Sequence, residues 1–500
     1  MRNLSSMGSA PTQSGTDAPA LPFKPSPTQI TLFALATAGS ITLTLLLLIV
    51  GYREPKLALM FVGGLAAAGM GALILWQPQF GAYALVVVIF TNMSTIFTDQ
   101  GLPSINKPLV ALIFASLLLN RLFTRQSLPR WGILEWAMIG YGCVWVASGF
   151  VADQQWLVMA LVTDFAKDFI ILISVVAALS QARYWRRALW LVIWSATALA
   201  LLGSYQVLTG DYGQTFFGFA GNSSEQVLSG VLGYRLTGPL DDPNFYALIL
   251  AAALPLAIYR FLDERRLLYR LASAAAALLI LLALLNTYSR GGLVAVFVTG
   301  IFLLWERRVR PASLLFVGLA AALLLLFMPA AYSERLQSFT DVLSGEATVQ
   351  EESSLRGRTS EFISGLMMFA EHPLLGVGVG NFPDQYQQYA SQLGLEYRAR
   401  PREAHSLYVE LLAETGLLGL AAFSLLFGSL LLRLNRLRQA ARRRDPHTAA
   451  WIASLLFSLI AYLTASIFLH GDYIRYLWLL VSLSVAATHL YKVSSMRYEV

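Results

Sequence analysis

The sequence predicts an all-α protein: a polytopic helical bundle in a membrane, with about 12 to 14 transmembrane helices and a large outer loop that contains short helices. Of its 500 residues, 56% are hydrophobic and only 13% are charged, which is far more apolar than an ordinary globular domain. Uninterrupted apolar segments recur from residue 31 to the end. Each has about 18 to 25 residues and can cross roughly 30 Å of hydrocarbon as a helix.

The first thirty residues are rich in Ser, Pro and Thr and have no apolar core before a small-residue cleavage site. We expect a disordered cytoplasmic tail over 1–30 rather than a cleaved signal peptide, so that the first membrane helix directs targeting. The single cysteine, Cys143, lies inside an apolar segment. It excludes a disulfide framework and a thiolate metal site.

Fourteen segments are long and apolar enough to be predicted as spanning helices. They are 31–51, 57–76, 80–97, 107–122, 132–151, 157–179, 187–207, 244–261, 270–287, 291–305, 311–330, 405–431, 449–469 and 474–490. The predicted organisation is N-terminal helices over 31–207, an outer loop over 208–243, central helices over 244–330, a large outer loop over 331–404, C-terminal helices over 405–490 and a cytoplasmic tail over 491–500.

Arginine-rich loops fall on every second connection, and such short basic loops stay in the cytoplasm. The two long connections, 208–243 and 331–404, then lie on the outer side, where a rigid scaffold can hold functional loops. The net charge of +7 comes mostly from these cytoplasmic anchors, so we expect contact with membrane lipids and no nucleic-acid partner.

The larger outer loop has apolar residues at helical spacing from Thr359 onward. They predict a short amphipathic helix against the membrane, with Arg356 and Arg358 at its start. The run Gly376-Val-Gly-Val-Gly380 then ends it. No strand precedes these glycines, so they indicate an ordinary loop rather than a nucleotide-binding site.

Arg290 in NTYSRGG lies between two apolar segments, at the outer face of the predicted bundle. An arginine at that depth is costly unless it is paired or lines a wet cavity. As the start of a helix, this position also favours an anion. The alternative is an arginine that reaches the lipid headgroups. Arg235 fits either interpretation, whereas Asp242 followed by Pro243 is typical of a helix cap.

Asp164, Lys167 and Asp168 share one face of the segment 157–179. Three ionisable groups in such an apolar helix indicate either a neutralised cluster that joins helices or a substrate contact or proton path. Both interpretations stay open.

His405 stands at the outer end of a predicted helix, beneath the loop that supplies arginines, and neutral imidazole is the side chain best suited to accept a proton near pH 7. The other four histidines lack such a setting and are interpreted as interfacial or structural. Below His405, Gly416 and Gly419 lie about one turn apart. They predict that a neighbouring helix approaches closely there.

These residues carry a resemblance to the bacterial O-antigen ligase and O-antigen polymerase superfamily. His405 and Ser406 are followed by nine residues and then by Gly416-x-x-Gly419, the hallmark spacing of that family. The segments TYSRGG, GRTSEF and HPLLGVGVGNF are also similar to it. The resemblance covers about residues 230 to 500, and the family commonly has about twelve helices.

The resemblance implies an inverting, metal-independent glycosyltransferase of the inner membrane without a cofactor, whose active site faces the periplasm. Its donor would be an undecaprenyl-diphosphate-linked glycan, and its acceptor a glycan or the lipid A-core. Arg290 and Arg358 would hold the diphosphate, and His405 would activate the acceptor hydroxyl. The further substrate-binding candidates are Arg235, Arg356, Asp164, Lys167 and Asp168.

Three alternatives stay open. A repeat-unit polymerase of the same superfamily uses the same chemistry and differs in its acceptor. A solute transporter would have inverted repeats and helices interrupted at the midplane. A non-catalytic scaffold would leave the outer arginines without a role.

Overall fold

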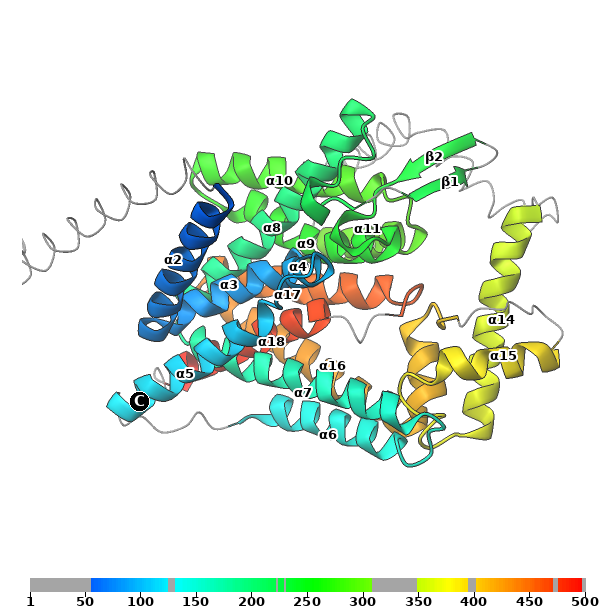
Figure 1. Cartoon of the computed structure of the whole chain (residues 1–500). Helices are drawn as coiled ribbons and strands as arrows, with labels where there is room; N and C mark the ends of the chain where they lie inside the picture. The colour runs from blue at the N-terminus through cyan, green and yellow to red at the C-terminus, as the bar shows by residue number, and fades with distance from the viewer. Residues whose placement is uncertain are drawn as a thin grey trace, which may run out of the picture. The chain divides into compact units, whose positions relative to one another are not determined.

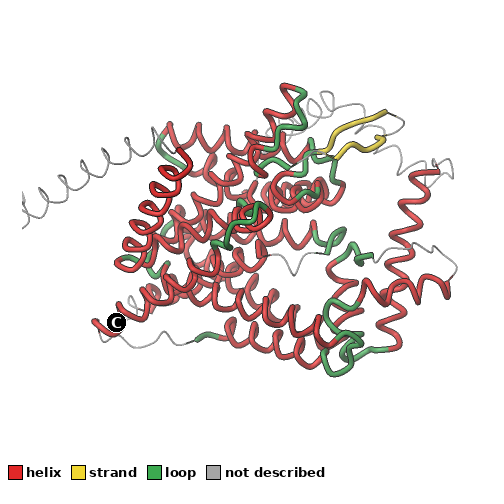
Figure 2. The backbone as a smooth tube through the Cα atoms, viewed as in Figure 1, coloured by secondary structure: helices red, strands yellow, loops and turns green. Residues whose placement is uncertain are grey.

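The computed structural model describes residues 55–124, 131–221, 224–228, 231–307, 349–393, 402–470 and 475–496. It contains fifteen α-helices in those residues and one two-stranded hairpin (Figure 2). The chain divides into two units, 1–72 and 73–500. Of the first unit, only the start of helix α2 (Pro55–Trp76) is described. The rest of the fold belongs to the second unit.

Most helices of the second unit coincide with predicted segments, whereas α15 was not predicted and α16 extends beyond the predicted end at residue 431. Figure 1 shows their arrangement. They are α3 (Pro78–Phe90), α4 (Met93–Asp99), α5 (Asn106–Thr124), α6 (Ile133–Ser148), α7 (Gln155–Ala178), α8 (Ala182–Thr209), α9 (Pro243–Asp263), α10 (Leu267–Leu285), α11 (Arg290–Arg307), α14 (Val349–Glu371), α15 (Phe382–Leu393), α16 (Leu407–Arg444), α17 (Pro446–Ala465) and α18 (Arg475–Met496). The predicted spans 31–51 and 311–330 lie outside the described residues, as do the tails.

Among the described helices, α8, α9, α10, α16 and α17 are each long and apolar enough to cross a membrane, and the bent pair α3 and α4 can form a sixth span. Helix α7 carries Asp164, Lys167 and Asp168, and α11 carries Arg290, Glu306 and Arg307. With three charged residues each, these two helices are too charged to be counted as candidate spans. The chain is therefore an all-α, multi-pass membrane protein, as the sequence predicts.

Helices α9 and α17 form the centre of the second unit. In an apolar 18-residue stretch of each helix, 78% of the residues of α9 and 83% of those of α17 are buried, against 28% of those of α10. The hydroxyl of Ser458 on α17 donates to the backbone carbonyl of Ala252 on α9. Trp185 of α8 donates its ring N–H to the carbonyl of Leu483 on α18, at 2.9 Å. These bonds hold central helices together at buried positions where an unpaired polar group would be costly.

The connection 208–243, predicted as a plain loop, contains a hairpin of β1 (Ser224–Leu228) and β2 (Val231–Arg235). The strands are antiparallel, with Ser224 opposite Arg235. Short strands of this kind carry a weak sequence signal because two strands bury little on their own. The predicted cap of α9 is confirmed: Asp242 accepts from the backbone N–H of Asn244 and Phe245, and Pro243 is the first helical residue.

Two helix breaks stand out in the described part of the chain. Asn92, with φ of 54°, separates α3 from α4, which are bent by 63°. Its side chain donates to the carbonyl of Pro239 at 2.9 Å, so this break lies close to the segment that precedes α9. The second break is at Gly416 inside α16, next to the candidate site.

Candidate active site

The turn that follows α17 gathers the candidate residues of several elements. The backbone N–H of Leu407 donates to the carbonyls of Ser466 and Leu469, at 3.0 and 3.1 Å. This bond pair fixes the first turn of α16 and therefore the height of His405. The ring of His470 meets the ring of His405 edge to face, with centroids 5.9 Å apart. Sequence reasoning interpreted His470 as interfacial or structural and missed this proximity.

Arg290 begins α11 at the same turn. A Cβ on Gly291 would stand 3.2 Å from Cβ of Phe468 and 3.4 Å from the carbonyl oxygen of Ala465, so the first turn of α11 packs closely against the end of α17. Tyr288 just before it has φ of 52°. This bend in the backbone follows α10 and turns the chain into α11.

Arg235 supports that bend from the other side. Its Nε donates to the carbonyl of Thr287 at 2.8 Å, and its Nη2 donates to the side-chain oxygen of Asn244 at 3.2 Å. Arg235 is 6% exposed. The guanidinium therefore joins β2, the bend at Thr287 and the start of α9. Phe245 of the same α9 turn meets the ring of His470 edge to face at 5.1 Å, which brings these segments to the His405 side of the bundle.

His405 has φ of 47°, a conformation that few non-glycine residues adopt. Its Nδ1 lies 3.0 Å from the carbonyl oxygen of Glu403, with hydrogen-bonding geometry. The same nitrogen lies at ion-pair distance, also 3.0 Å, from Oε2 of Glu361. Because both neighbours of Nδ1 are hydrogen-bond acceptors, they favour the imidazole tautomer that is protonated on Nδ1. Nε2 then keeps its lone pair, and it makes no hydrogen bond to any described residue.

Glu361 is the residue of this site that the sequence analysis missed. It lies on α14, its side chain is fully buried, and its Oε1 is 2.9 Å from Nε of Arg402. The carboxylate thus stands between the Arg402 guanidinium and the His405 imidazole. A signal was present, because Glu361 follows the candidate Arg358 by one helical turn in GRTSEF. The sequence does not reveal that this side of α14 turns toward His405.

The charges around His405 raise its pKa. Burial alone lowers the pKa of this imidazole, but the hydrogen bond and charge of Glu361, with the Glu403 carbonyl, outweigh burial and the opposing charge of Arg358. For His470, burial and the positive charge of His405 lower the pKa to about 4. His470 is therefore the neutral member of the pair at pH 7. The pKa of His405, in contrast, lies above that of an ordinary histidine.

Helix α14 differs from the prediction in extent. It begins at Val349, before Arg356 and Arg358, so these arginines do not start it. Its buried side carries Ser360, Glu361 and Ser364, each with no exposed surface, as well as Met368. Phe362, on the apolar side that was predicted to face the membrane, is 49% exposed. Arg358 is exposed and within electrostatic reach of His405, while the side chain of Arg356 lies outside the described set.

Gly416 and Gly419 do not serve a helix–helix approach as predicted. Gly416 has φ of 60° and ψ of −157°, a conformation that is essentially restricted to glycine. A Cβ there would stand 2.5 Å from the backbone carbon of Leu374. At Gly419, a Cβ would meet the side chain of Thr415 on the same helix. The close partner is a loop backbone, because a helix that breaks at Gly416 frees peptide groups for that loop.

The loop that meets this break is the glycine-rich run. Val377 and Gly378 donate their N–H groups to the carbonyls of Ala413 and Glu414, at 2.8 and 2.9 Å. Leu417 donates to the carbonyl of Pro373 at 2.8 Å. Gly376 has φ of 67°, and a Cβ there would stand 2.3 Å from the backbone of Glu414. The glycines therefore allow two backbones to pair beneath His405, in agreement with their interpretation as a loop.

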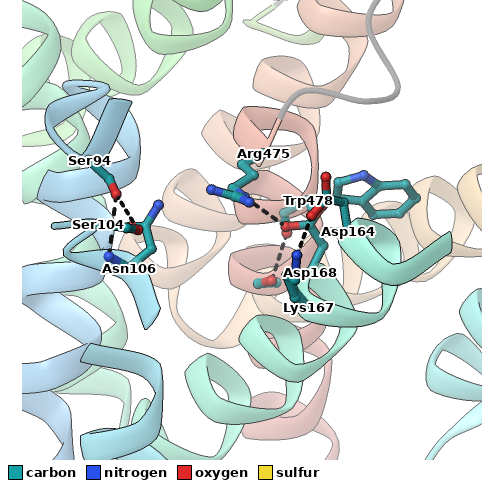
Figure 3. Close-up of polar contacts among 9 residues, drawn as sticks. Ser94, Ser104, Asn106, Asp164, Lys167, Asp168, Arg475 and Trp478 are labelled. Atoms are coloured by element: carbon teal, nitrogen blue, oxygen red, sulfur yellow. Dashed lines mark hydrogen bonds and ion pairs between the residues drawn. The ribbon is translucent and has the colours of Figure 1, made fainter. Parts of the chain in front are cut away.

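The charged cluster of α7, formed by Asp164, Lys167 and Asp168, faces α18 (Figure 3). Lys167 pairs with Asp164 within the helix at 2.6 Å, and both are partly exposed. Asp168 is buried and lies 3.5 Å from Nε of Arg475 at the start of α18. Figure 3 shows the Arg475 side chain pointing at Asp168. This pair joins α7 to α18, and the structure gives no contact between the cluster and His405.

Comparison with known proteins gives one family match. Residues 275–424 match the family model described as O-antigen ligase. This stretch includes Arg290, Arg358, Glu361, His405 and Gly416. No curated protein matches the chain.

Proposed function

We propose, from the match of residues 275–424 to the family model described as O-antigen ligase, that the chain is a membrane glycosyltransferase of that superfamily. It would transfer a glycan from an undecaprenyl-diphosphate carrier to an acceptor hydroxyl, with inversion and without a metal or cofactor. The reaction would take place at the periplasmic face of the inner membrane. Arg290, Arg358 and His405 are the proposed catalytic residues.

One observation carries the proposal: His405 is arranged as a general base. Its Nδ1 is held by the Glu403 carbonyl and faces the Glu361 carboxylate, so the lone pair is on Nε2. A carboxylate on the far nitrogen fixes the tautomer and stabilises the imidazolium that forms when Nε2 takes a proton. A free lone pair on Nε2 and a stabilised imidazolium are both needed to activate a hydroxyl group near neutral pH.

The proposed step follows from this arrangement. The acceptor hydroxyl gives its proton to Nε2 of His405 while its oxygen bonds to the anomeric carbon of the donor sugar. The bond from that carbon to the diphosphate oxygen breaks, and its electron pair leaves with the diphosphate. Attack from the side opposite the leaving group inverts the anomeric configuration.

The arginines act on the leaving group. Negative charge grows on the diphosphate as the bond breaks, and guanidinium groups stabilise it through bidentate hydrogen bonds in a pocket of low dielectric constant. Arg290 starts α11 beside the α17 turn, and Arg358 is within electrostatic reach of His405. Arg235 has a positioning role in this scheme, because its guanidinium donates hydrogen bonds to the bend before α11 and to α9.

Ligase and repeat-unit polymerase share this step and differ in the acceptor. Deleting the gene separates the two, because loss of a ligase leaves long chains on the carrier lipid and loss of a polymerase leaves single repeat units there. We propose the ligase-like activity first, since the matched family model carries that description. A transporter is the less favoured alternative, because the family model that residues 275–424 match describes a ligase.

The test is a transfer assay with the purified full-length protein, a lipid-linked glycan and an acceptor. We expect His405→Ala to abolish transfer. His372→Ala is the matched control, because His372 is exposed on the neighbouring loop and has no role in the step. Transfer at the wild-type rate by a folded His405→Ala protein would refute the scheme.

A further inference from the structure

The ring of His470 lies between two other rings. It meets the ring of His405 edge to face, with centroids 5.9 Å apart and planes at 87°. It meets the ring of Phe245 in the same way, at 5.1 Å and 89°. Both separations fall within the range of about 4.5 to 7 Å in which aromatic pairs attract one another. The row of rings therefore joins the segment before α16, the turn after α17 and the first turn of α9.

The backbone holds His470 at a fixed height relative to His405. Leu407, two residues after His405, donates its N–H to the carbonyl of Leu469, the residue before His470, at 3.1 Å. On the other side, Phe245 belongs to the capped first turn of α9. The ring of His470 is thus packed between two segments whose backbones are themselves hydrogen-bonded, and it can serve as a rigid support.

The anchored nitrogen of His405 does not by itself fix the plane of its ring. Nδ1 is held by the carbonyl of Glu403 and faces Glu361, but contacts at one nitrogen let the imidazole rock about that nitrogen. The χ2 angle of histidine has a broad energy minimum. A second ring packed against the imidazole limits this motion, and in the described part of the chain His470 is the ring that does so.

The turn that carries His470 also contacts the helix of Arg290. A Cβ on Gly291 would stand 3.2 Å from Cβ of Phe468, so this turn packs against the first turn of α11. One short segment therefore contacts the base through His470 and the arginine helix through Phe468. The segment sets the position of the base relative to the start of α11.

His470 adds no positive charge beside the base. Burial and the charge of His405 lower the pKa of His470 to about 4, so its ring is neutral near pH 7. A second cation there would lower the pKa of His405 and oppose proton transfer to its Nε2. Nδ1 of His470 is enclosed and makes no hydrogen bond to any described residue. The contact of His470 with His405 is therefore the packing of a neutral ring.

We propose that His470 is a further positioning residue, which holds the imidazole of His405 in the plane that directs Nε2 toward the acceptor hydroxyl. This role rests on the proposed function for the base and its step, whereas the contact between the two rings does not. His470 acts through His405 and touches neither donor nor acceptor. Its removal should therefore lower kcat and leave KM nearly unchanged.

The kinetic test separates the ring of His470 from its nitrogen atoms. Because a shift of about 1 Å in a catalytic group can lower a rate about a hundredfold, His470→Ala should lower kcat roughly tenfold to a hundredfold. His470→Phe keeps a flat ring and should keep most of the rate. His470→Leu fills the space without a flat ring, so it should resemble His470→Ala, and it replaces that variant should alanine prevent folding.

The control is His372→Ala, because His372 is exposed just after α14. It should match wild type in both kcat and KM. A rate that is lost in His470→Phe and restored in His470→Asn would overturn the positioning role, and it would indicate a hydrogen bond from His470 to substrate.

A spectroscopic test needs no substrate. Solid-state NMR of the full-length protein in lipid, with 15N in its five histidines, reports the protonation of each ring nitrogen. The signals of His405 are those that disappear in His405→Ala. At alkaline pH, where His405 is neutral, wild type and His470→Phe should show one protonated and one unprotonated nitrogen. In His470→Ala the two shifts should move toward each other, because a rocking ring exchanges its tautomers.

Identical His405 shifts in wild type and in a folded His470→Ala protein would overturn the role of His470. The kinetic and spectroscopic results also distinguish this role from the proposed function. Absence of glycan transfer by the wild-type protein would refute the proposed function, and the NMR comparison would still decide whether His470 holds the ring of His405. Transfer by wild type with an unchanged kcat in folded His470→Ala would refute the role of His470 and leave the proposed function standing.

Discussion

Nδ1 of His405 lies 3.0 Å from Oε2 of Glu361, a carboxylate whose side chain has no exposed surface. The second oxygen of the same carboxylate is 2.9 Å from Nε of Arg402. A buried carboxylate without a cation would be costly, and the Arg402 guanidinium compensates the charge of Glu361 beside the imidazole. We infer that Glu361 is a positioning residue, which acts on the acceptor only through His405.

Glu361→Gln should lower kcat by roughly tenfold to a thousandfold with little change in KM, because it removes the charge beside Nδ1 and preserves the shape. Glu361→Asp should restore part of the rate. Steady-state kinetics with the lipid-linked donor give the result. Glu371→Gln, on the exposed end of the same helix, is the control and should match wild type. An unchanged kcat in folded Glu361→Gln would rule out the positioning role.

The pH dependence should follow from the raised pKa of His405. A general base must be neutral, so kcat/KM should rise with pH along a limb centred above the ordinary histidine pKa of about 6.5. In Glu361→Gln the limb should move to lower pH, since burial and Arg358 both lower the pKa. A pH–rate profile of each protein measures the midpoint of this limb. An identical midpoint in the two proteins would contradict the role of Glu361 in raising the pKa of His405.

The pair of His405 and Glu361 also makes the stability of the folded protein depend on pH. Because the folded-state pKa of His405 is raised, the pair contributes fully below about pH 6.5, and its contribution is lost as pH rises through the folded-state pKa. Thermal unfolding in detergent across this range should show a smaller pH dependence in Glu361→Gln than in wild type.

Arg290→Ala and Arg358→Ala should each lower kcat/KM by about a hundredfold, equivalent to about 3 kcal/mol of transition-state stabilisation. Lysine should restore only part of this, because it lacks the planar pair of donors that binds a diphosphate. Arg265→Ala is the control, since Arg265 is exposed in the connection between α9 and α10. Wild-type rates in both alanine variants would eliminate the cationic diphosphate site.

Gly416→Ala should destabilise the protein by about 2 kcal/mol or more, because alanine is strained at this φ and ψ and its Cβ would overlap the backbone of Leu374. Thermal unfolding in detergent measures the effect. Gly428→Ala, with open space at its Cβ on the same helix, should be neutral or slightly stabilising. Equal stabilities of the two variants would mean that the break in α16 is not required.

Asp168→Ala should lower the unfolding temperature and leave kcat/KM unchanged, because Asp168 holds Arg475 of α18 and has no contact with the His405 site among the described residues. Reversing the pair, Asp168→Arg with Arg475→Asp, should recover part of the stability. A selective loss of transfer activity, with stability retained, would instead favour the substrate contact that the sequence left open.

The helices of this protein were predictable because length and apolarity are local properties of the chain. Segments such as 244–261 and 449–469 are long and apolar enough to be predicted as spans, and they are found as α9 and α17. The cap at Asp242 was predictable for the same reason, since it depends on neighbouring residues alone. The hairpin β1–β2 and the inward side of α14 were not, because both depend on contacts with distant segments.

The sequence by itself therefore determined the membrane class, the helix positions and the candidate residues Arg290, Arg358 and His405, because each follows from local composition or spacing. Only the tertiary structure decided which side chains surround His405. Glu361 and His470 come from separate elements and meet it through the packing of α14 and the α17 turn. A carboxylate changes the basicity of an imidazole only within a few ångströms, and packing alone sets that separation.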